Sequence, residues 1–240
     1  MSGTYDDIAP LRGGGDTASR PDTESAEHQR RQSANTRVPI TVVEPEGHTR
    51  GGIVVLHESR EFSTTLLDLM SALADEGWTV VAPNLFHRSE QPDNGVFGDE
   101  LFDDFDACFD WLTARDILPD CVGVLGFDSA GTAAFLVATN RPIGAAVSVA
   151  APGIVEPLTE QADALVHAAP NLQAPWLGLF GTDDPATPAT QIDQLRDATA
   201  RADVASLVIT YPGLRHRAPE SIDLGDSHTR IFDWFDSNLR

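Results

Sequence analysis

The stretch VGVLGFDSAG, residues 122–131, decides the fold class of this chain. Its apolar first half predicts a buried strand, and the small residues that follow lead directly into a segment with helical spacing. A strand that turns this tightly into a helix is the sequence form of a nucleophile elbow, which holds one strained residue at its tip. The sequence therefore predicts an α/β protein with a reactive side chain at this turn.

Two residues compete for the tip of the turn. The positions two before and two after the tip must be small, because the backbones of strand and helix crowd there. A tip at Asp128 puts Gly126 and Ala130 at those positions, whereas a tip at Ser129 puts Phe127 at one of them. Side-chain size favours Asp128. The Ser129 alternative stays open, since it brings DSAG close to the GDSAG elbow of serine esterases.

Outward from the elbow, short β-branched runs alternate with segments at helical spacing, which predicts a mainly parallel sheet of seven or eight strands with helices on both faces. No insertion is long enough for a lid domain. The expected strands are Val38–Val43, Gly52–His57, Thr79–Ala82, Val122–Phe127, Gly144–Ala150, Trp176–Phe180 and Ser206–Tyr211. The expected helices cover about 64–76, 98–115, 130–140, 158–168, 189–201 and 227–239.

The expected helix at 98–115 is amphipathic and rich in aspartate. One face carries apolar side chains and the other carries acids, which we interpret as a solvated face and not as a metal site. The apolar members are Leu101, Phe105, Cys108, Phe109 and Leu112, and the acids are Asp103, Asp104, Asp106 and Asp110.

Length and composition predict one domain. The chain has 240 residues, of which 41% are hydrophobic, enough for one sizeable core. Residues 1–36 hold few branched apolar side chains, so we expect a disordered or loosely packed tail before a domain at 37–240. Cys108 and Cys121 suggest buried thiols without disulfide or metal spacing. No apolar run reaches the roughly 18 residues of a membrane span and no leader opens the sequence, so we expect a cytoplasmic protein.

The chain is strongly acidic. It has 37 acidic residues against 16 basic ones, all arginine, for a formal charge of −21. Such a surface repels nucleic acids and anionic membranes, so neither is an expected partner. A small-molecule substrate is expected instead, with the protein a monomer or a homodimer. No cofactor is indicated.

Four motifs in order resemble the dienelactone hydrolase family of α/β-hydrolases. They are VVLHESREFSTTLLDLMSALADEGWTVVAPNLFHR at 54–88, the elbow, LFGTDDPATP at 179–188 and YPGLRH at 211–216. Their order is more specific than any single motif, and the resemblance covers about residues 38–240. It implies the α/β-hydrolase fold and hydrolysis of a carboxylic ester or a lactone.

The resemblance also implies roles for individual residues. His216 matches the triad histidine and Asp184 the triad acid, with Asp183 as the neighbouring alternative. Glu58 matches a glutamate beside the nucleophile. The backbone N–H groups of Ser59 and of the residue after the tip, Ser129, match the oxyanion hole. Arg88 matches an arginine that holds a substrate carboxylate.

The elbow departs from the family pattern, because Asp128 stands where the family usually has cysteine or serine. A serine nucleophile at Ser129, activated by His216, would give ordinary esterase chemistry. An aspartate nucleophile suits attack on sp³ carbon, as in haloalkane dehalogenases and epoxide hydrolases. A third possibility is a binding protein that keeps the fold without catalysis. The retained His216 and Asp184 favour an enzyme.

Overall fold

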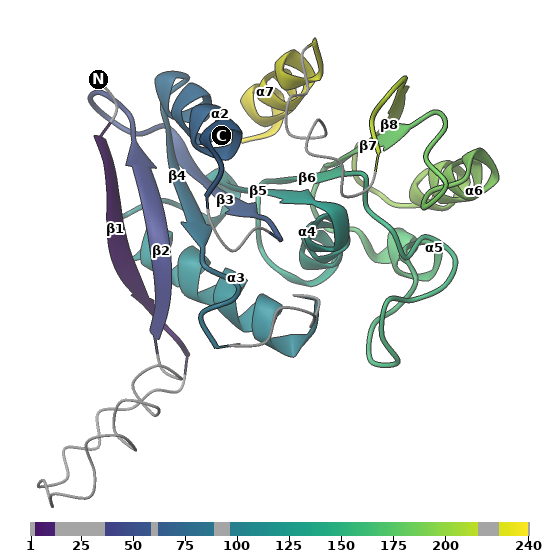
Figure 1. Ribbon diagram of the computed structural model, residues 1–240, viewed down its shortest axis with the longest axis horizontal. Helices are drawn as coiled ribbons and strands as arrows, with labels where there is room; N and C mark the ends of the chain where they lie inside the picture. Colours follow the sequence, from purple (N-terminus) through teal and green to yellow (C-terminus); the bar gives the residue numbers. More distant parts are fainter. Residues whose placement is uncertain (1–2, 13–36, 59–61, 89–96, 216–225, 240) are drawn as a thin grey trace, which may run out of the picture.

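The computed structural model describes residues 3–12, 37–58, 62–88, 97–215 and 226–239. These residues form an eight-stranded sheet in the order β1-β2-β4-β3-β5-β6-β7-β8, covered by helices (Figure 1). The pairs β1/β2 and β2/β4 are antiparallel, and the other pairs are parallel. The expected mainly parallel α/β-hydrolase sheet is confirmed, and the described part of the chain holds no separate lid domain.

The helices and strands follow the sequence pattern closely. The strands are β1 (Gly3–Pro10), β2 (Arg37–Glu44), β3 (Gly51–Leu56), β4 (Trp78–Pro83), β5 (Val122–Phe127), β6 (Ala145–Val149), β7 (Trp176–Gly181) and β8 (Ser206–Tyr211). The helices are α2 (Thr64–Asp75), α3 (Asp99–Thr113), α4 (Asp128–Asn140), α5 (Leu165–Ala168), α6 (Ala189–Thr199) and α7 (Asp226–Asn238). None of the described helices is long and apolar enough to cross a bilayer.

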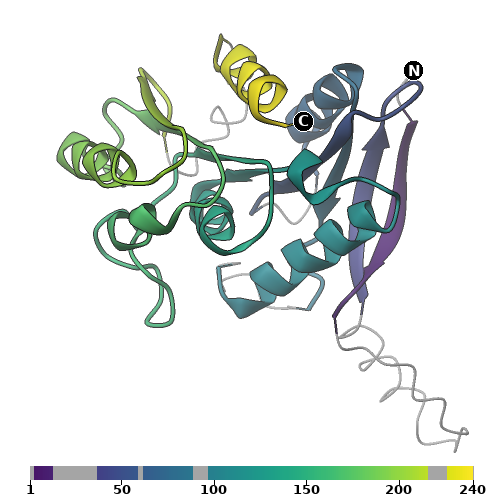
Figure 2. The same ribbon diagram turned by 180° about the vertical axis from the view of Figure 1, so that it is seen from behind.

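The core consists of two apolar layers, one on each face of the sheet. Helices α3, α4, α5 and α6 contribute to one layer, and α2 and α7 contribute to the other (Figures 1 and 2). Neighbouring strand residues alternate between the layers: Val54 packs with the first and Val55 with the second. Burial on both faces of the sheet explains why nearly every residue of β3, β4 and β5 is apolar.

The amino-terminal segment is ordered where the sequence predicted a disordered or loosely packed tail. Gly3–Pro10 forms the edge strand β1, which pairs with β2 along its whole length. Asp7 also accepts a hydrogen bond from Trp111 Nε1 of α3 at 3.0 Å. The prediction is wrong for these residues, because an edge strand is held by backbone hydrogen bonds and needs little apolar burial. The rest of the expected tail, residues 13–36, lies outside the described residues.

The helix expected at 158–168 is much shorter than predicted, since only Leu165–Ala168 is helical. Gly153 has φ +78°, and its carbonyl oxygen accepts a hydrogen bond from the N–H of Leu165 at 3.0 Å. This bond ties the chain before the helix into a loop, so the helix begins only after Ala164.

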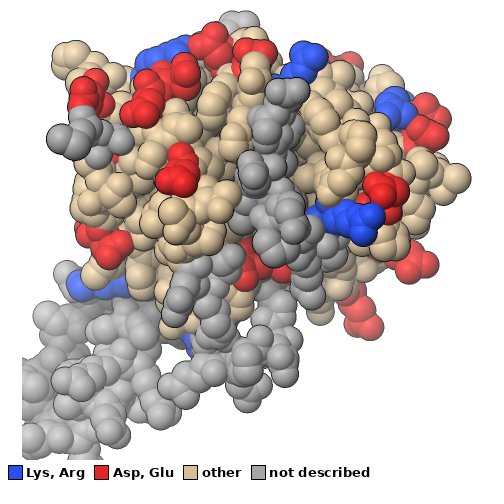
Figure 3. Space-filling model, turned by 45° about the horizontal axis from the view of Figure 1, so that its top comes forward, with Lys and Arg blue, Asp and Glu red and all other residues tan. Residues whose placement is uncertain are grey.

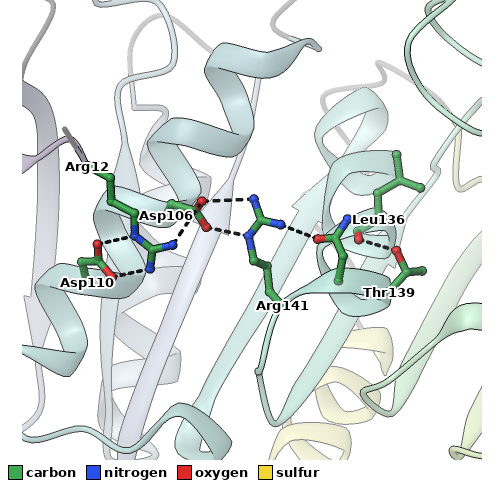
Figure 4. A network of polar contacts seen from close by, with 7 residues as sticks. Arg12, Asp106, Asp110, Leu136, Thr139 and Arg141 are labelled. Atoms are coloured by element: carbon green, nitrogen blue, oxygen red, sulfur yellow. Dashed lines mark hydrogen bonds and ion pairs between the residues drawn. The ribbon is translucent and has the colours of Figure 1, made fainter.

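The acids of α3 do not form a uniformly solvated face, so the interpretation of this face as solvated is wrong for two of them. Asp104 is 1% exposed and Asp106 is 9% exposed. Each is compensated by an arginine from a neighbouring segment: Arg88 pairs with Asp104 and Arg141 with Asp106. Figure 4 shows the Asp106 pair as part of a network that joins α3 to the end of α4. Burial of these acids therefore depends on partners that lie far away in sequence.

Candidate active site

The candidate site lies at the carboxyl edge of the parallel strands. Strands β4, β3, β5, β6 and β7 run parallel to one another as neighbours, so their carboxyl ends share one edge of the sheet. Glu58 follows β3, Arg88 follows β4, Asp128 follows β5 directly and Asp184 follows β7. Open α/β sheets bind their ligands at this edge. The topology thus gathers residues that follow four different strands.

Asp128 is the residue at the tip of the turn between β5 and α4. Its φ is +55°, a left-handed conformation that costs a non-glycine residue strain. A Cβ on Gly126 would lie 2.2 Å from the carbonyl oxygen of Ala130, so the chain needs glycine there. Ser129 has entered the first turn of α4 and is 7% exposed. Sterics thus place the carboxylate of residue 128 at the tip, with the serine one position beyond it.

Glu58 contacts the turn directly. Its Oε1 accepts a hydrogen bond from the backbone N–H of Ser129 at 3.1 Å. This N–H points out of the first turn of α4, where the helix dipole favours a negative charge. The donor that the family resemblance assigns to an oxyanion is therefore engaged by a carboxylate in this structure. Ser59, which the resemblance assigns as the second donor, lies outside the described residues.

The neighbouring acids Asp183 and Asp184 occupy different environments. Asp184 is 4% exposed, and its Oδ1 accepts a hydrogen bond from the N–H of Ala186 at 2.9 Å. Asp183 is exposed and forms an ion pair with Arg215 at 3.0 Å, which lowers the pKa of its carboxyl. A buried, fixed carboxylate suits the orientation of a histidine better than an exposed one. The geometry favours Asp184 over Asp183 for such a role.

The segment that leads to His216 packs against the turn that carries these acids. A Cβ on Gly181 would lie 1.9 Å from the carbonyl oxygen of Leu214 and 3.0 Å from Cβ of Asp184. Leu214 therefore packs against Gly181, and Arg215 pairs with Asp183, so both residues contact the turn at 181–184. His216 itself lies outside the described residues, so its predicted role stays a prediction.

Arg88 lies in a cluster that the sequence did not predict. Its Nη2 lies 2.6 Å from Oδ1 of Asp104, and the same oxygen lies 3.2 Å from Nε2 of His87. All three side chains are at most 10% exposed. His87 and Asp104 were not singled out as site residues. The signal for Asp104 was its place three residues after Leu101 and four before Cys108, on the apolar stripe of the helix.

The described residues contain no group of three or more His, Cys, Asp or Glu side chains that could hold a metal ion. The described part of the site offers one strained carboxylate, a backbone donor beside it, and a buried acid on the turn that residues 214 and 215 contact. These are the parts of a nucleophilic or general-base site.

Known proteins resemble this chain over most of its length. A Yersinia pestis protein provisionally named a carboxymethylenebutenolidase is 25% identical over 226 residues, covering 85% of each chain. A provisionally assigned dienelactone hydrolase from Klebsiella pneumoniae superposes with a TM-score of 0.72 at 20% identity, covering 98% of this chain and 99% of that one. The dienelactone hydrolase of Anabaena variabilis superposes with a TM-score of 0.67 at 19% identity, covering 100% and 99%. These superpositions establish the α/β-hydrolase fold.

The family assignment comes from a match to the model of a whole protein family. The model of the dienelactone hydrolase family matches residues 38–220, which include the elbow and all the site motifs. The chain is a hydrolase that belongs to the dienelactone hydrolase family.

Proposed function

We propose that this protein hydrolyses a carboxylic ester or a lactone, with Asp128 as nucleophile and His216 and Asp184 as the base and acid of the triad. The position of Asp128 at the strained tip carries the proposal. Membership of the dienelactone hydrolase family and the relatives named as carboxymethylenebutenolidases support the substrate class. The burial of Asp184 and the contact of Leu214 with Gly181 support the other two roles.

The reaction has two steps. The carboxylate of Asp128 attacks the acyl carbon, and the N–H groups of Ser129 and Ser59 hold the resulting oxyanion. Glu58 must first release the N–H of Ser129. His216 begins this step as the imidazolium and gives its proton to the departing oxygen, which leaves a mixed anhydride on Asp128. His216 then removes a proton from water, and the water cleaves the anhydride to the product acid and free Asp128.

The weak basicity of a carboxylate restricts the substrate. A carboxylate expels an alkoxide with difficulty, because an alkoxide is a far stronger base than a carboxylate. A phenolate or enolate, with a conjugate acid near pKa ~10, departs far more readily. The proposed substrates are therefore phenyl or enol esters and enol lactones. Simple alkyl esters should react slowly.

The same carboxylate favours one other reaction, attack on an sp³ carbon that bears a halide or an epoxide oxygen. That reaction leaves an alkyl ester on Asp128, which water cleaves at the aspartate carbonyl. Turnover of such a substrate in H₂¹⁸O would place the heavy isotope in Asp128, which peptide mass spectrometry detects. Turnover of an epoxide with labelled Asp128, and no turnover of p-nitrophenyl acetate, would establish this second function.

The nucleophile is tested with p-nitrophenyl acetate and three variants. Asp128→Asn should abolish turnover, Ser129→Ala should change it little, and Asp128→Ser should retain or raise it because an alkoxide nucleophile suits the same site. Loss of activity in Ser129→Ala with full activity in Asp128→Asn would instead make the serine the nucleophile.

The base and acid are tested with a matched pair of aspartate variants. His216→Ala and Asp184→Asn should each lower kcat by roughly 10² to 10⁴, since both remove general-base assistance. Asp183→Asn changes the adjacent, exposed carboxylate and should stay within roughly threefold of the wild type. Equal losses in Asp183→Asn and Asp184→Asn would contradict the assignment of the acid.

A further inference from the structure

A buried ionic cluster at the carboxyl end of β4 consists of His87, Arg88 and Asp104. Arg88 Nη2 lies 2.6 Å from Asp104 Oδ1, a short charge-assisted contact. Arg88 Nη1 also donates to the carbonyl oxygen of Glu100 at 3.4 Å. The side chain of Arg88 is 10% exposed and that of Asp104 is 1% exposed. Both hydrogen-bonding ends of the guanidinium are thus turned toward α3.

Asp104 cannot easily give up this arginine. It lies in the middle of α3, between the apolar side chains Leu101 and Cys108 on the same face of the helix. Its second oxygen, Oδ2, is buried and accepts no hydrogen bond from the described residues. A buried carboxylate with one unsatisfied oxygen depends strongly on its remaining cationic partner. Replacing Asp104 by a substrate carboxylate at Arg88 would leave that charge uncompensated.

The charge balance of the cluster has a consequence for recognition. With a neutral imidazole at His87, the single charges of Arg88 and Asp104 cancel, and the cluster offers an incoming anion no excess positive charge. The whole chain carries a formal charge of −21, which adds long-range repulsion toward anions. An arginine at this position would attract a carboxylate only if it were not already paired.

We propose that Asp104 determines the charge preference of the substrate site: by pairing with Arg88 it directs the enzyme toward esters or lactones whose acyl part is uncharged. The inference rests on the proposed ester or lactone hydrolysis. Asp104 acts through Arg88 and is a positioning residue, not a catalytic one.

The kinetic test compares two six-carbon acyl esters that differ in a terminal carboxylate, p-nitrophenyl hexanoate and p-nitrophenyl hydrogen adipate. At pH 8 the wild type should prefer the hexanoate in kcat/KM by roughly tenfold. Asp104→Asn leaves the arginine charge unopposed, so this preference should fall by roughly tenfold, chiefly through KM for the adipate ester. A wild type that prefers the adipate ester overturns the proposal.

The double variant Arg88→Gln/Asp104→Asn guards against a fold defect, since it removes both buried charges together. Its preference for the hexanoate should equal that of the wild type, because a paired arginine contributes nothing to selection. If the double variant discriminates against the adipate ester much more than the wild type does, then Arg88 binds the substrate carboxylate in the wild type. Pairing with Asp104 would then not prevent that binding, and the proposal would be wrong.

A binding measurement separates this inference from the proposed hydrolysis. Calorimetric titration with dimethyl adipate and monomethyl adipate compares a neutral and an anionic ligand without requiring turnover. The wild type should bind the neutral diester more tightly, and Asp104→Asn should narrow the difference. If neither p-nitrophenyl ester is hydrolysed, the proposed function fails, and the two affinities still decide the role of Asp104. Equal or tighter binding of the monoester by the wild type refutes it.

Discussion

Gly126 is the residue on which the geometry of the elbow depends. A methyl group there would lie 2.2 Å from the carbonyl oxygen of Ala130 and 2.8 Å from Cα of Gly131. Both contacts are with backbone, which cannot rotate out of the way. We therefore predict that Gly126→Ala lowers the free energy of unfolding by about 1–3 kcal/mol or more, and that it displaces Asp128.

Urea unfolding measures the first effect, and turnover of an activated ester measures the second. Gly3→Ala is the matched control, because a Cβ at that position meets no atom within 4 Å. It should change stability by less than about 0.5 kcal/mol. Similar stabilities for Gly126→Ala and the control would mean that strand and helix can separate at the elbow without cost.

His57, the residue before Glu58, makes stability depend on pH. It is 1% exposed, and burial lowers its pKa from 6.5 to about 4. In the unfolded chain the imidazole binds a proton below about pH 6.5, whereas in the folded chain it does so only near pH 4. Acidification from pH 6.5 toward pH 4 therefore favours unfolding, and above pH 6.5 the effect is absent.

The prediction is a difference between two proteins. Relative to His57→Leu, which has no proton to bind, the wild type should lose about 2 kcal/mol of unfolding free energy between pH 7 and pH 5. Urea titrations of both proteins at the two pH values measure this. All other titratable groups are the same in both proteins, so their contributions cancel in the comparison. If the unfolding free energies of the two proteins changed equally with pH, His57 would bind its proton as readily in the folded as in the unfolded chain.

At the level of elements, α3 is the connector between the amino-terminal strand and the end of α4. Asp106 accepts hydrogen bonds from Nε and Nη2 of Arg141 at 2.8 and 3.0 Å (Figure 4). One turn later, Asp110 accepts from Nε and Nη2 of Arg12, just after β1. A third contact joins Arg12 to Asp106 at 3.6 Å. The helix thus anchors two segments that are distant in sequence.

The two halves of this network should differ in strength. The side chain of Asp106 is 13% exposed and that of Arg141 is 29% exposed, whereas that of Arg12 is 55% exposed. We predict that Asp106→Asn lowers the unfolding free energy by roughly 1–3 kcal/mol, because the substitution removes a hydrogen-bonded carboxylate that is largely shielded from solvent. Arg12→Gln should cost less than about 1 kcal/mol. Urea unfolding compares the two, and an equal loss would mean that solvent does not weaken the outer pair.

At the level of the whole molecule, unbalanced negative charge is the dominant electrostatic feature. The chain has 21 more acidic than basic residues, and its isoelectric point is about 4.4. Figure 3 shows acidic side chains scattered over the face in view, with a few arginines between them. Negative charges spread over a surface in this way repel one another through the solvent, and mobile ions screen this repulsion over about 8–10 Å.

Salt should therefore stabilise the fold. Between 0.01 and 0.5 M NaCl we expect the Tm to rise by several degrees, since screening weakens repulsion among many acids more than it weakens the few ion pairs. Differential scanning calorimetry at pH 7.5 measures this, with choline chloride as a control for effects of a particular cation. A Tm that falls with salt would show that the arginine pairs outweigh the repulsion.

The sequence by itself determined the order of the central elements, and it favoured Asp128 over Ser129 at the tip of the elbow. Seven of the strands were predicted because each is a short run rich in apolar or β-branched residues, a local pattern that does not depend on partners. Asp128 was favoured at the tip for an equally local reason, the need for small residues at 126 and 130. The site motifs could be assigned to the carboxyl edge of the sheet because each of them follows a predicted strand. The roles of His216 and Ser59 stay predictions.

Only the tertiary structure decided which polar residues are buried and which are solvated. Gly3–Pro10 became a strand because β2 offered an unpaired edge, and nothing in the polar sequence of that segment required it. Asp104 and Asp106 are buried because Arg88 and Arg141 reach them from other elements. The ion pair with Asp104 holds Arg88 against α3, although the sequence predicted that Arg88 would bind substrate. Asp104 and Asp106 can enter the core because a distant arginine pairs with each, and such pairing is a property of packing, which spacing along one helix cannot reveal.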